Sequence, residues 1–453
     1  MSDTPVLSRA VVYVGPVVTM DPDRPRADAF AVRGDRIVAV GSRDEAIAAA
    51  GADPDVVHLD GTVLPGLIDA HLHMERGALR AMVYAPQATS ADEIGRRMLE
   101  TFWDPDWPGE KPATVEQSVD ALRRFQPHLH SLGFTGAVDP ATTPLEMRGY
   151  QVAHARGALT MRVLAMPYLE IGSAQTPDID AVIAVLGGLG LSTGFGDEML
   201  RVGPIKVYAD GEATKGEALL EQPWDASGFH GVQRISDAEY GRLVAWCAAH
   251  GWGVGTHAVG GAAIALVVDA YSATGAAVRD QRFQIIHGYL EPAPAVMAKA
   301  AEIGAIASLQ PSIIWHNGAA LRERLGVRAE TANPVRSWLN AGVHVAFGSD
   351  GPFFEFDPRL LIWQAVTRHV RDAAEPLSAA EAIDVAEGFA AYTTGAAYAA
   401  MAEQCRGMIR VGMLADWALW ERDPVNAPVD ELRGIRVLRT DVGGRTVYER
   451  NDA

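Results

Sequence analysis

The feature that most constrains the fold of this chain is a regular alternation of strand-like and helix-like segments through its middle. Runs rich in Val and Ile, expected to be buried strands, are separated by segments that carry helix start and stop signals. The expected strands are eight: residues 63–70, 135–140, 161–169, 201–210, 252–257, 282–287, 305–311 and 343–350. Eight β/α units predict an α/β protein with a (β/α)₈ TIM-like barrel, with a doubly wound sheet as the alternative.

The clearest helix signal lies between two of these strands. Ser236 and Glu239 form an S-x-x-E capping box, and the helix that they open is expected to end near His250–Gly251. Three further helices are expected at residues 261–271, 292–303 and 334–340. The positions of these helices between strands support the parallel arrangement.

Both ends of the chain have a different pattern, with short Val/Ile-rich runs broken by turn residues. Gly34–Asp35 is a two-residue hairpin signal, and the glycine pair Gly443–Gly444 separates two runs near the other end. We therefore expect the first sixty residues to be β-structure. The two ends, residues 1–62 and 405–453, are expected to form one small β-sandwich domain beside a barrel domain of residues 63–404.

Composition excludes several classes of protein. Hydrophobic residues make up 48% of the 453 and charged residues 21%, as in an ordinary globular enzyme. A net charge of −18 argues against a nucleic-acid partner. The apolar run at residues 260–268 is too short to span a membrane, and the first residues lack the pattern of a signal peptide. We expect a soluble, cytoplasmic protein with no membrane partner.

Side chains that can bind metal or transfer protons gather at the ends of the expected strands. His71 and His73 follow the first strand and, being two residues apart, share a face. The other residues of this kind at strand ends are Lys206, His257, His287 and Asp350. In a barrel the carboxyl ends of the strands carry the functional groups.

Each of these residues taken alone has an ordinary structural explanation. His257 and His287 could be core or capping histidines, and Asp350 stands in a turn. Lys206 is harder to explain, because an ammonium group is rarely buried without a partner. Taken together, imidazole and carboxylate are the ligands of Zn²⁺ and similar cations, and lysine joins them only without its positive charge. With Cys247 and Cys405 as the only cysteines, a C-x-x-C metal clip is ruled out.

This pattern resembles the amidohydrolase superfamily over essentially the whole chain. VLPGLIDAHLH (63–73) and GMLADWALWERDP (412–424) are similar to segments of that superfamily. IKVYADG (205–211) and SLQPS (308–312) look most like its branch that contains N-substituted formamide deformylase. DGEATKGEALL (210–220) and RFQIIH (282–287) differ from that branch, which leaves the substrate open.

The resemblance implies a binuclear centre of one or two divalent metal ions, with zinc favoured. His71, His73 and Asp350 would hold the more buried ion, and His257 and His287 the second. An N6-carboxylated Lys206 would bridge the two ions. A metal-activated hydroxide would then attack an amide, formamide or cyclic amide, with Asp350 carrying the proton to the leaving nitrogen.

Two other functions stay open. Deaminases of amino-heterocycles in this superfamily typically carry a glutamate three residues after the strand-five histidine, where this chain has Gly260. A non-catalytic barrel scaffold would be expected to lose metal ligands, whereas all six are present here. The expected partner is a small-molecule substrate, and dimers or larger homo-oligomers are common in the superfamily.

Several residues near the expected barrel mouth are candidates for substrate contact. They are Tyr289, Trp315, His316 and Phe353, although core packing explains them equally well. Trp103 and Trp107 lie in a Pro/Trp-rich loop that could form a lid. His128 and His130 form a second H-x-H before the second strand, at the wrong end of a barrel, and are expected to be structural.

Overall fold

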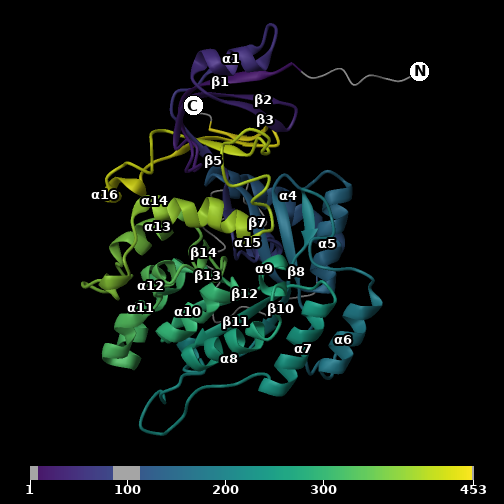
Figure 1. The fold of residues 1–453 in the computed structure, drawn as a ribbon, viewed down its shortest axis with the longest axis vertical. Helices are drawn as coiled ribbons and strands as arrows, with labels where there is room; N and C mark the ends of the chain where they lie inside the picture. The colour runs from purple at the N-terminus through teal and green to yellow at the C-terminus, as the bar shows by residue number, and fades with distance from the viewer. Residues whose placement is uncertain (1–8, 85–112, 451–453) are drawn as a thin grey trace.

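The computed structural model describes residues 9–84 and 113–450, and every structural statement below concerns these ranges. The expected lid residues Trp103 and Trp107 lie outside them. In Figure 1 the two end segments of the chain, purple and yellow, lie together in one sheet at the top. The strands and helices of the middle of the chain lie below this sheet.

The sheet at the top combines strands from both ends of the chain. Its order is β17-β16-β15-β5-β1-β2-β3, and β4 pairs with β1. The strands are β1 (Val11–Val18), β2 (Arg26–Arg33), β3 (Arg36–Gly41), β4 (Asp55–His58), β5 (Thr62–Pro65), β15 (Trp417–Trp420), β16 (Val437–Val442) and β17 (Arg445–Glu449). Gly34–Asp35 forms the turn between β2 and β3, and Gly443–Gly444 forms the turn between β16 and β17, as the sequence predicts.

One element within the first sixty residues is a helix, so the expectation of β-structure throughout is wrong there. Helix α1 (Arg43–Ala50) begins at Ser42, whose side chain accepts a hydrogen bond from the Glu45 N–H. The Glu45 side chain accepts in return from the Ser42 N–H. This reciprocal capping stabilises the first turn of an alanine-rich segment.

The middle of the chain holds two parallel sheets, β6-β7-β8-β9 and β10-β11-β12-β13-β14. Their strands are β6 (Leu67–Asp69), β7 (Phe134–Thr142), β8 (Arg162–Pro167), β9 (Leu200–Val202), β10 (Ile205–Tyr208), β11 (Val254–Gly260), β12 (Gln284–Leu290), β13 (Ile306–Leu309) and β14 (His344–Phe347). Isolated parallel β-bridges join the two sheets at both of their edges. Tyr168 pairs with Lys206 at one edge, and Leu72 pairs with Gly351 at the other.

Two of the expected strands are each split in the structure. The strand expected at 63–70 divides at Gly66, so that β5 joins the sheet of the chain ends and β6 joins a parallel sheet. A Cβ at Gly66 would lie 2.2 Å from Thr135 Cγ2, so only glycine fits at this crossing. The strand expected at 201–210 divides at Gly203–Pro204, where proline has no N–H to continue the pairing.

Helices separate the parallel strands along the chain. They are α2 (Met74–Tyr84), α4 (Val115–Ser131), α5 (Pro144–Ala155), α6 (Ile179–Gly188), α7 (Asp237–Ala249), α8 (Gly261–Ser272), α9 (Ala277–Asp280), α10 (Pro294–Ile303), α11 (Pro311–Leu325) and α12 (Val335–Asn340). Three helices follow the last parallel strand, β14: α13 (Pro358–Thr367), α14 (Val385–Ala390) and α15 (Ala396–Ala399). Helix α16 (Val429–Leu432) lies between β15 and β16. Helix α7 begins at the predicted capping box, and His250 is its C-cap. The helices expected at 261–271, 292–303 and 334–340 correspond to α8, α10 and α12.

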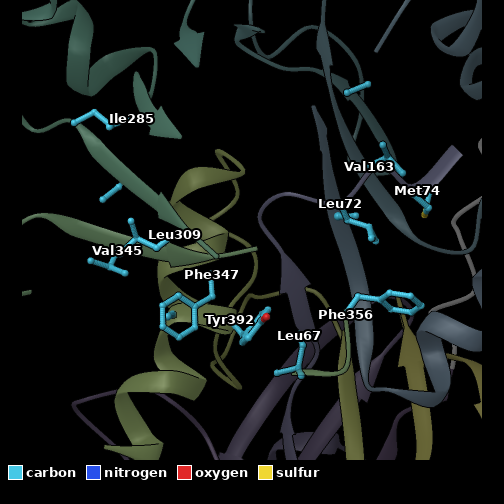
Figure 2. Packing of buried hydrophobic residues seen from close by; sticks show 14 of the residues in the cluster. Leu67, Leu72, Met74, Val163, Ile285, Leu309, Val345, Phe347, Phe356 and Tyr392 are labelled. Carbon is cyan, nitrogen blue, oxygen red and sulfur yellow. The ribbon is translucent and has the colours of Figure 1, made fainter. Parts of the chain in front are cut away.

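Successive residues of the parallel strands belong to two different apolar clusters. Figure 2 shows part of the larger cluster, in which Ile285, Leu309 and Val345 come from neighbouring strands and Phe347 faces Tyr392. Their strand neighbours Ile286 and Ala346 belong instead to a smaller cluster with α15. The strands are therefore buried on both faces.

The same alternation fixes the direction of Lys206. Ile205 and Val207 belong to the larger cluster, so Lys206 between them points to the opposite face of β10. No helix among the described residues is long and apolar enough to cross a membrane.

Candidate metal centre

The six predicted ligands lie around one cavity of about 430 Å³. His71, His73, Lys206, His257, His287 and Asp350 all line it, although they come from segments up to 279 residues apart in the sequence. All but Asp350 are more than nine-tenths buried. The ligand atoms of His71, His287 and Asp350 lie within 4.8 Å of one another, which is close enough to share one ion.

The loops after β6 and β14 are tied together by Asp69. Its carboxylate accepts hydrogen bonds from the backbone N–H of His71 and of Ser349, both at 3.0 Å. The backbone completes the connection, since Asp350 N donates to His71 O at 2.7 Å and His73 N donates to Gly351 O at 2.9 Å. The candidate ligands that follow the first and last strands of the parallel array therefore lie side by side.

Asp350 lies between the two histidines of the H-x-H motif. Its Oδ1 is 3.5 Å from His71 Nε2 and 3.4 Å from His73 Nε2. Burial pushes the pKa of Asp350 upward, but hydrogen bonds from both imidazoles outweigh it and hold that pKa well below its ordinary value. The residue has φ 54°, in the left-handed region that non-glycine residues adopt at a cost.

His287 is held by Gln310, which also determines its tautomer. Its Nδ1 lies 2.8 Å from Gln310 Oε1, and Gln310 Nε2 donates to Ser308 O at 3.0 Å. Because Oε1 can only accept, Nδ1 of His287 must carry the proton, which leaves the lone pair on Nε2. Like Asp350, His287 adopts a positive φ, at 78°.

His257 has the opposite tautomer. Its Nε2 lies 3.4 Å from Gly211 O, a group that can only accept, and 3.5 Å from Asp210 Oδ1. The proton is therefore on Nε2 and the lone pair on Nδ1. Asp210 is fixed in turn by the backbone N–H groups of Val259, Gly260 and Leu219.

Lys206 is buried, with 3% of its surface exposed, on the cavity side of β10. Its amine lies 5.1 Å from the centroid of the Tyr208 ring. Burial lowers the pKa of Lys206 to about 7, although the negative charge of Asp350 acts in the opposite direction. Near neutral pH a large share of this amine is therefore uncharged, the form able to react with CO₂.

The chemistry of these groups fits a divalent metal ion. Burial lowers the pKa of His71 and of His257 to about 3, and it lowers the pKa of His73 and His287 as well. All four imidazoles are therefore neutral near pH 7, as metal ligands must be. Among the described residues, His71 Nδ1 and His73 Nδ1 are buried without a hydrogen-bond partner, which is unusual for polar atoms.

The remaining predicted residues are placed differently. Tyr289 and Phe353 line the cavity, and the Phe353 ring lies 4.9 Å from that of His73. Trp315 and His316 are not among the described residues that line the cavity. The Trp315 ring packs against that of Trp363, and His316 Nδ1 lies 3.4 Å from Glu355 Oε2. Their role in substrate contact stays a prediction.

His130 has a structural role, as the sequence analysis expects. Both ring nitrogens are occupied, Nδ1 at 2.8 Å from Phe134 O and Nε2 at 2.8 Å from Thr160 Oγ1. Burial lowers the pKa of His130 to about 4. The ring therefore connects the end of α4 to the strand that follows and has no free lone pair for a metal.

Sequence reasoning missed the groups that support the histidines and part of the cavity wall. The supporting groups are Asp69, Asp139, Asp210 and Gln310. Asp139 Oδ1 lies 4.0 Å from His73 Nδ1, and Asp139 Oδ2 accepts a hydrogen bond from the Tyr150 hydroxyl. Each supporting group lies on or directly after a parallel strand, and that position is the signal that could have found them. The further wall residues are Arg76, Tyr208, Glu212, Ala213, Thr214, Lys215, Val259, Ile313, Asn317 and Phe354.

Known proteins resemble this chain in sequence and in fold. The family model of the amidohydrolases matches residues 86–448. N-substituted formamide deformylase of Arthrobacter pascens is 27% identical over 346 residues, which cover 74% of this chain and 61% of that protein. The chain thus spans less than two thirds of the length of this relative.

Two solved structures have a similar fold. A metal-dependent hydrolase of Pyrococcus horikoshii superposes with a TM-score of 0.76 at 20% identity, over 93% of this chain and 99% of that one. Atrazine chlorohydrolase TrzN of Arthrobacter aurescens, complexed with zinc, superposes with a TM-score of 0.61 at 18% identity, over 97% and 95% of the two chains.

Proposed function

The chain belongs to the amidohydrolase family, and we propose that it is a metal-dependent hydrolase that cleaves a C–N bond of an amide, formamide or cyclic amide. One observation carries this proposal: four neutral imidazoles, a buried lysine and a carboxylate surround a single cavity. The names of the relatives, a formamide deformylase and a metal-dependent hydrolase, support the same class of reaction.

The proposal includes the architecture that brings these groups together. We take the two parallel sheets to close into a (β/α)₈ barrel within residues 63–404, and the sheet of the chain ends to form a β-sandwich domain. The parallel bridges at both edges and the burial of the strands on both faces support closure. The ligands would then all project from the carboxyl ends of the barrel strands.

The proposed assignment of ligands is the one that the resemblance to the superfamily implies. His71, His73 and Asp350 would hold one ion, since Asp350 Oδ1 lies 3.5 Å or less from both imidazoles. His257 and His287, whose ring centroids are 4.6 Å apart, would hold a second ion through Nδ1 and Nε2 respectively. Lys206 would react with CO₂, release a proton and become a carbamate, whose oxygens would supply further ligands. Zinc is the favoured metal for such nitrogen and oxygen ligands.

The reaction adds water across the C–N bond and gives a carboxylic acid and an amine. The bound ion supplies Lewis acidity, which lowers the pKa of water and polarises the carbonyl oxygen. Asp350, whose carboxylate is ionised, accepts the proton of the attacking water and delivers it to the leaving nitrogen. Tyr289 and Phe353 contact the substrate from the wall of the cavity.

Metal removal and reloading test this function. Protein stripped with a chelator is assayed against a formamide, an N-acyl amine, a lactam and a hydantoin-like ring, and again after zinc is restored. We expect hydrolysis of at least one compound only with metal bound. Lys206→Ala should lose both metal and activity, whereas Lys299→Ala, which removes an exposed lysine paired with Asp269, should change neither. Turnover by the stripped protein, or normal metal content in Lys206→Ala, would contradict the proposal.

A further inference from the structure

One buried amide side chain in the wall of the metal cavity has no role in the centre described above. Asn317, on α11, has 8% of its surface exposed and lines the same cavity as the six candidate ligands. No residue in the described ranges forms a hydrogen bond with its side chain. Since nearly all buried polar side chains in proteins are hydrogen-bonded, this amide is available to a molecule that enters the cavity.

Helix α11 is attached to the metal centre at its first turn. Gln310 is its N-cap and holds His287. The Ser312 hydroxyl donates to the carbonyl of Ser349, the residue directly before the last candidate ligand. Asn317 lies seven residues after Gln310, which is about 10 Å along a helix. Asn317 is therefore held at a fixed distance from two of the candidate ligands.

The packing of α11 directs Asn317 toward the cavity. Ile313, one turn earlier on the same face of the helix, also lines the cavity. The next residue, Gly318, lies on another side of the helix, where a Cβ would be only 2.8 Å from Val370 Cγ1. Close packing on that side prevents the helix from turning about its axis, so Asn317 stays aimed into the cavity.

The wall next to Asn317 is apolar. Ile313 belongs to an apolar cluster with Val259 and Tyr289, and all three line the cavity. Lys215 also lines the cavity, but it is exposed, so water screens its charge. A group that binds at the apolar wall loses its water, and burying a charge costs far more than burying an amide. We therefore expect the group that meets Asn317 to be uncharged.

An amide complements the Asn317 side chain best. This side chain offers one acceptor oxygen and two N–H donors. Another amide can form two hydrogen bonds with it at once, whereas a ketone has no donor and a hydrocarbon has neither donor nor acceptor. A cavity of about 430 Å³ has the size of a site for one small molecule. One substrate can therefore reach both Asn317 and the candidate ligands.

We propose that Asn317 binds a second, uncharged amide group of the substrate, several bonds away from the C–N bond that is hydrolysed. This inference rests on the proposed function, because it places the hydrolysed bond at the metal centre. The second amide does not react, so its hydrogen bonds stabilise substrate and transition state alike. They should therefore raise kcat/KM mainly by lowering KM.

The test compares three formamides of nearly equal shape. 4-Formamidobutanamide carries the second amide, whereas 4-formamidobutanoate has a carboxylate and N-(4-methylpentyl)formamide an isopropyl group in its place. Zinc-loaded wild type should prefer the amide to each of the others at least tenfold in kcat/KM, because they leave Asn317 without full pairing. Asn317→Leu keeps the size of the side chain without its hydrogen-bonding atoms. This variant should lose the preference, mainly through a higher KM for the amide.

Asn340→Leu is the matched control. Asn340 is the last residue of α12, is exposed and is not among the described residues that line the cavity. This variant should keep the wild-type preference. Zinc content should be the same in all three proteins, and a loss of zinc in Asn317→Leu would contradict a role in substrate binding alone. If Asn317→Leu fails to fold, as judged by circular dichroism, Asn317→Ala takes its place.

The proposal is overturned if folded Asn317→Leu keeps the preference, or if wild type does not prefer the amide to both other compounds. If zinc-loaded wild type hydrolyses none of the three, the proposed function fails for formamides, and calorimetric titration with the same compounds decides the second point. Tighter binding of the amide by wild type and Asn340→Leu, but not by Asn317→Leu, supports the role of Asn317. Any other pattern contradicts it.

Discussion

At the scale of single residues, the centre depends on imidazoles that are neutral and that present a defined nitrogen. Gln310 and Gly211 set opposite tautomers on His287 and His257, so each ring keeps one nitrogen free. Metal ligands in proteins commonly have such outer partners, which fix the ring and raise its basicity. The candidate ligands are thus prepared by groups that do not touch the ion.

The first prediction concerns Gln310. Replacing Gln310 by Ala removes the acceptor of His287 Nδ1 and should weaken zinc binding about 10- to 100-fold, measured by competition with a chromogenic chelator. Gln126→Ala is the matched control, because Gln126 is equally buried and bonds to the backbone of Leu122 and Ala158 away from the cavity. Equal zinc affinity in Gln310→Ala and wild type would show that Gln310 does not position His287.

The second prediction concerns the proton transfer assigned to Asp350. Asp350→Asn keeps the shape of the side chain but cannot accept the proton, so kcat should fall by about two orders of magnitude or more. The circular dichroism spectrum should stay unchanged. Asp372→Asn serves as control, because Asp372 also has a positive φ, 62°, but a largely exposed side chain. Near-native turnover in Asp350→Asn would exclude the shuttle role.

The sequence predicted the six candidate ligands because they stand at the ends of expected strands and together match the groups that bind a metal ion. It did not predict Gln310 or Asp210, since a polar residue after a strand is common in turns and loops. Nor did it predict Asp139, which lies within β7. Their importance depends on which imidazole each one meets across the parallel strands, and that is a tertiary contact. Whether Trp315 and His316 contact substrate depends on tertiary contacts too, and neither is among the described residues that line the cavity.

At the scale of elements, local signals predicted helix α7 closely. Ser236 caps it and accepts from the Glu239 N–H, in the S-x-x-E pattern visible in the sequence. The same pattern at Ser42 and Glu45 opens α1, between runs rich in Val and Ile that predict strands. The split at Gly66 has another cause, because β5 and β6 belong to different sheets and Gly66 lies against Thr135 where they cross. The split at Gly203–Pro204 is local, because proline has no N–H for the pairing.

The third prediction tests the cap of α7. Ser236→Ala leaves the N–H of Glu239 without its acceptor and should lower the free energy of unfolding by about 1 kcal/mol in urea denaturation. Ser272→Ala, at the exposed end of α8, should change that free energy by less than about 0.5 kcal/mol. A loss no larger in Ser236→Ala than in Ser272→Ala would mean that the capping box adds nothing.

At the scale of the whole molecule, a buried ion cluster connects the sheet of the chain ends to the parallel strands. Asp416, just before β15, accepts hydrogen bonds from Arg162 of β8 at 2.7 and 3.0 Å and from Arg406 at 3.0 Å. Burial pushes the pKa of Asp416 upward, but the charges of Arg162 and Arg406 outweigh it and hold that pKa below its ordinary value. The sequence showed Asp416 within a motif, but not its partners.

The fourth prediction follows from this cluster. Asp416→Asn leaves two buried guanidinium groups without their counter-charge and should lower the free energy of unfolding by about 3 kcal/mol near pH 7. Because the folded pKa is depressed, this contribution is present above the unfolded pKa near 4 and is lost as the pH falls through the lower folded value. The difference between variant and wild type should therefore shrink in acid.

The control for this cluster is Glu421→Gln, which removes a half-exposed carboxylate 2.6 Å from Arg436 in the same region. Its effect on the free energy of unfolding should stay below about 1 kcal/mol, because water screens exposed ion pairs. A loss in Asp416→Asn no greater than in Glu421→Gln would show that the buried cluster does not hold the two parts of the molecule together.

The central claim is that His71, His73, Lys206, His257, His287 and Asp350 form one metal centre. Anomalous diffraction at the zinc absorption edge, from crystals of the zinc-loaded protein, tests it most directly. We expect one or two peaks within the cavity that these side chains line, with distances of about 2.0–2.2 Å from zinc to nitrogen or oxygen ligands. Zinc bound only elsewhere, or a cavity without a peak in fully loaded protein, would contradict it.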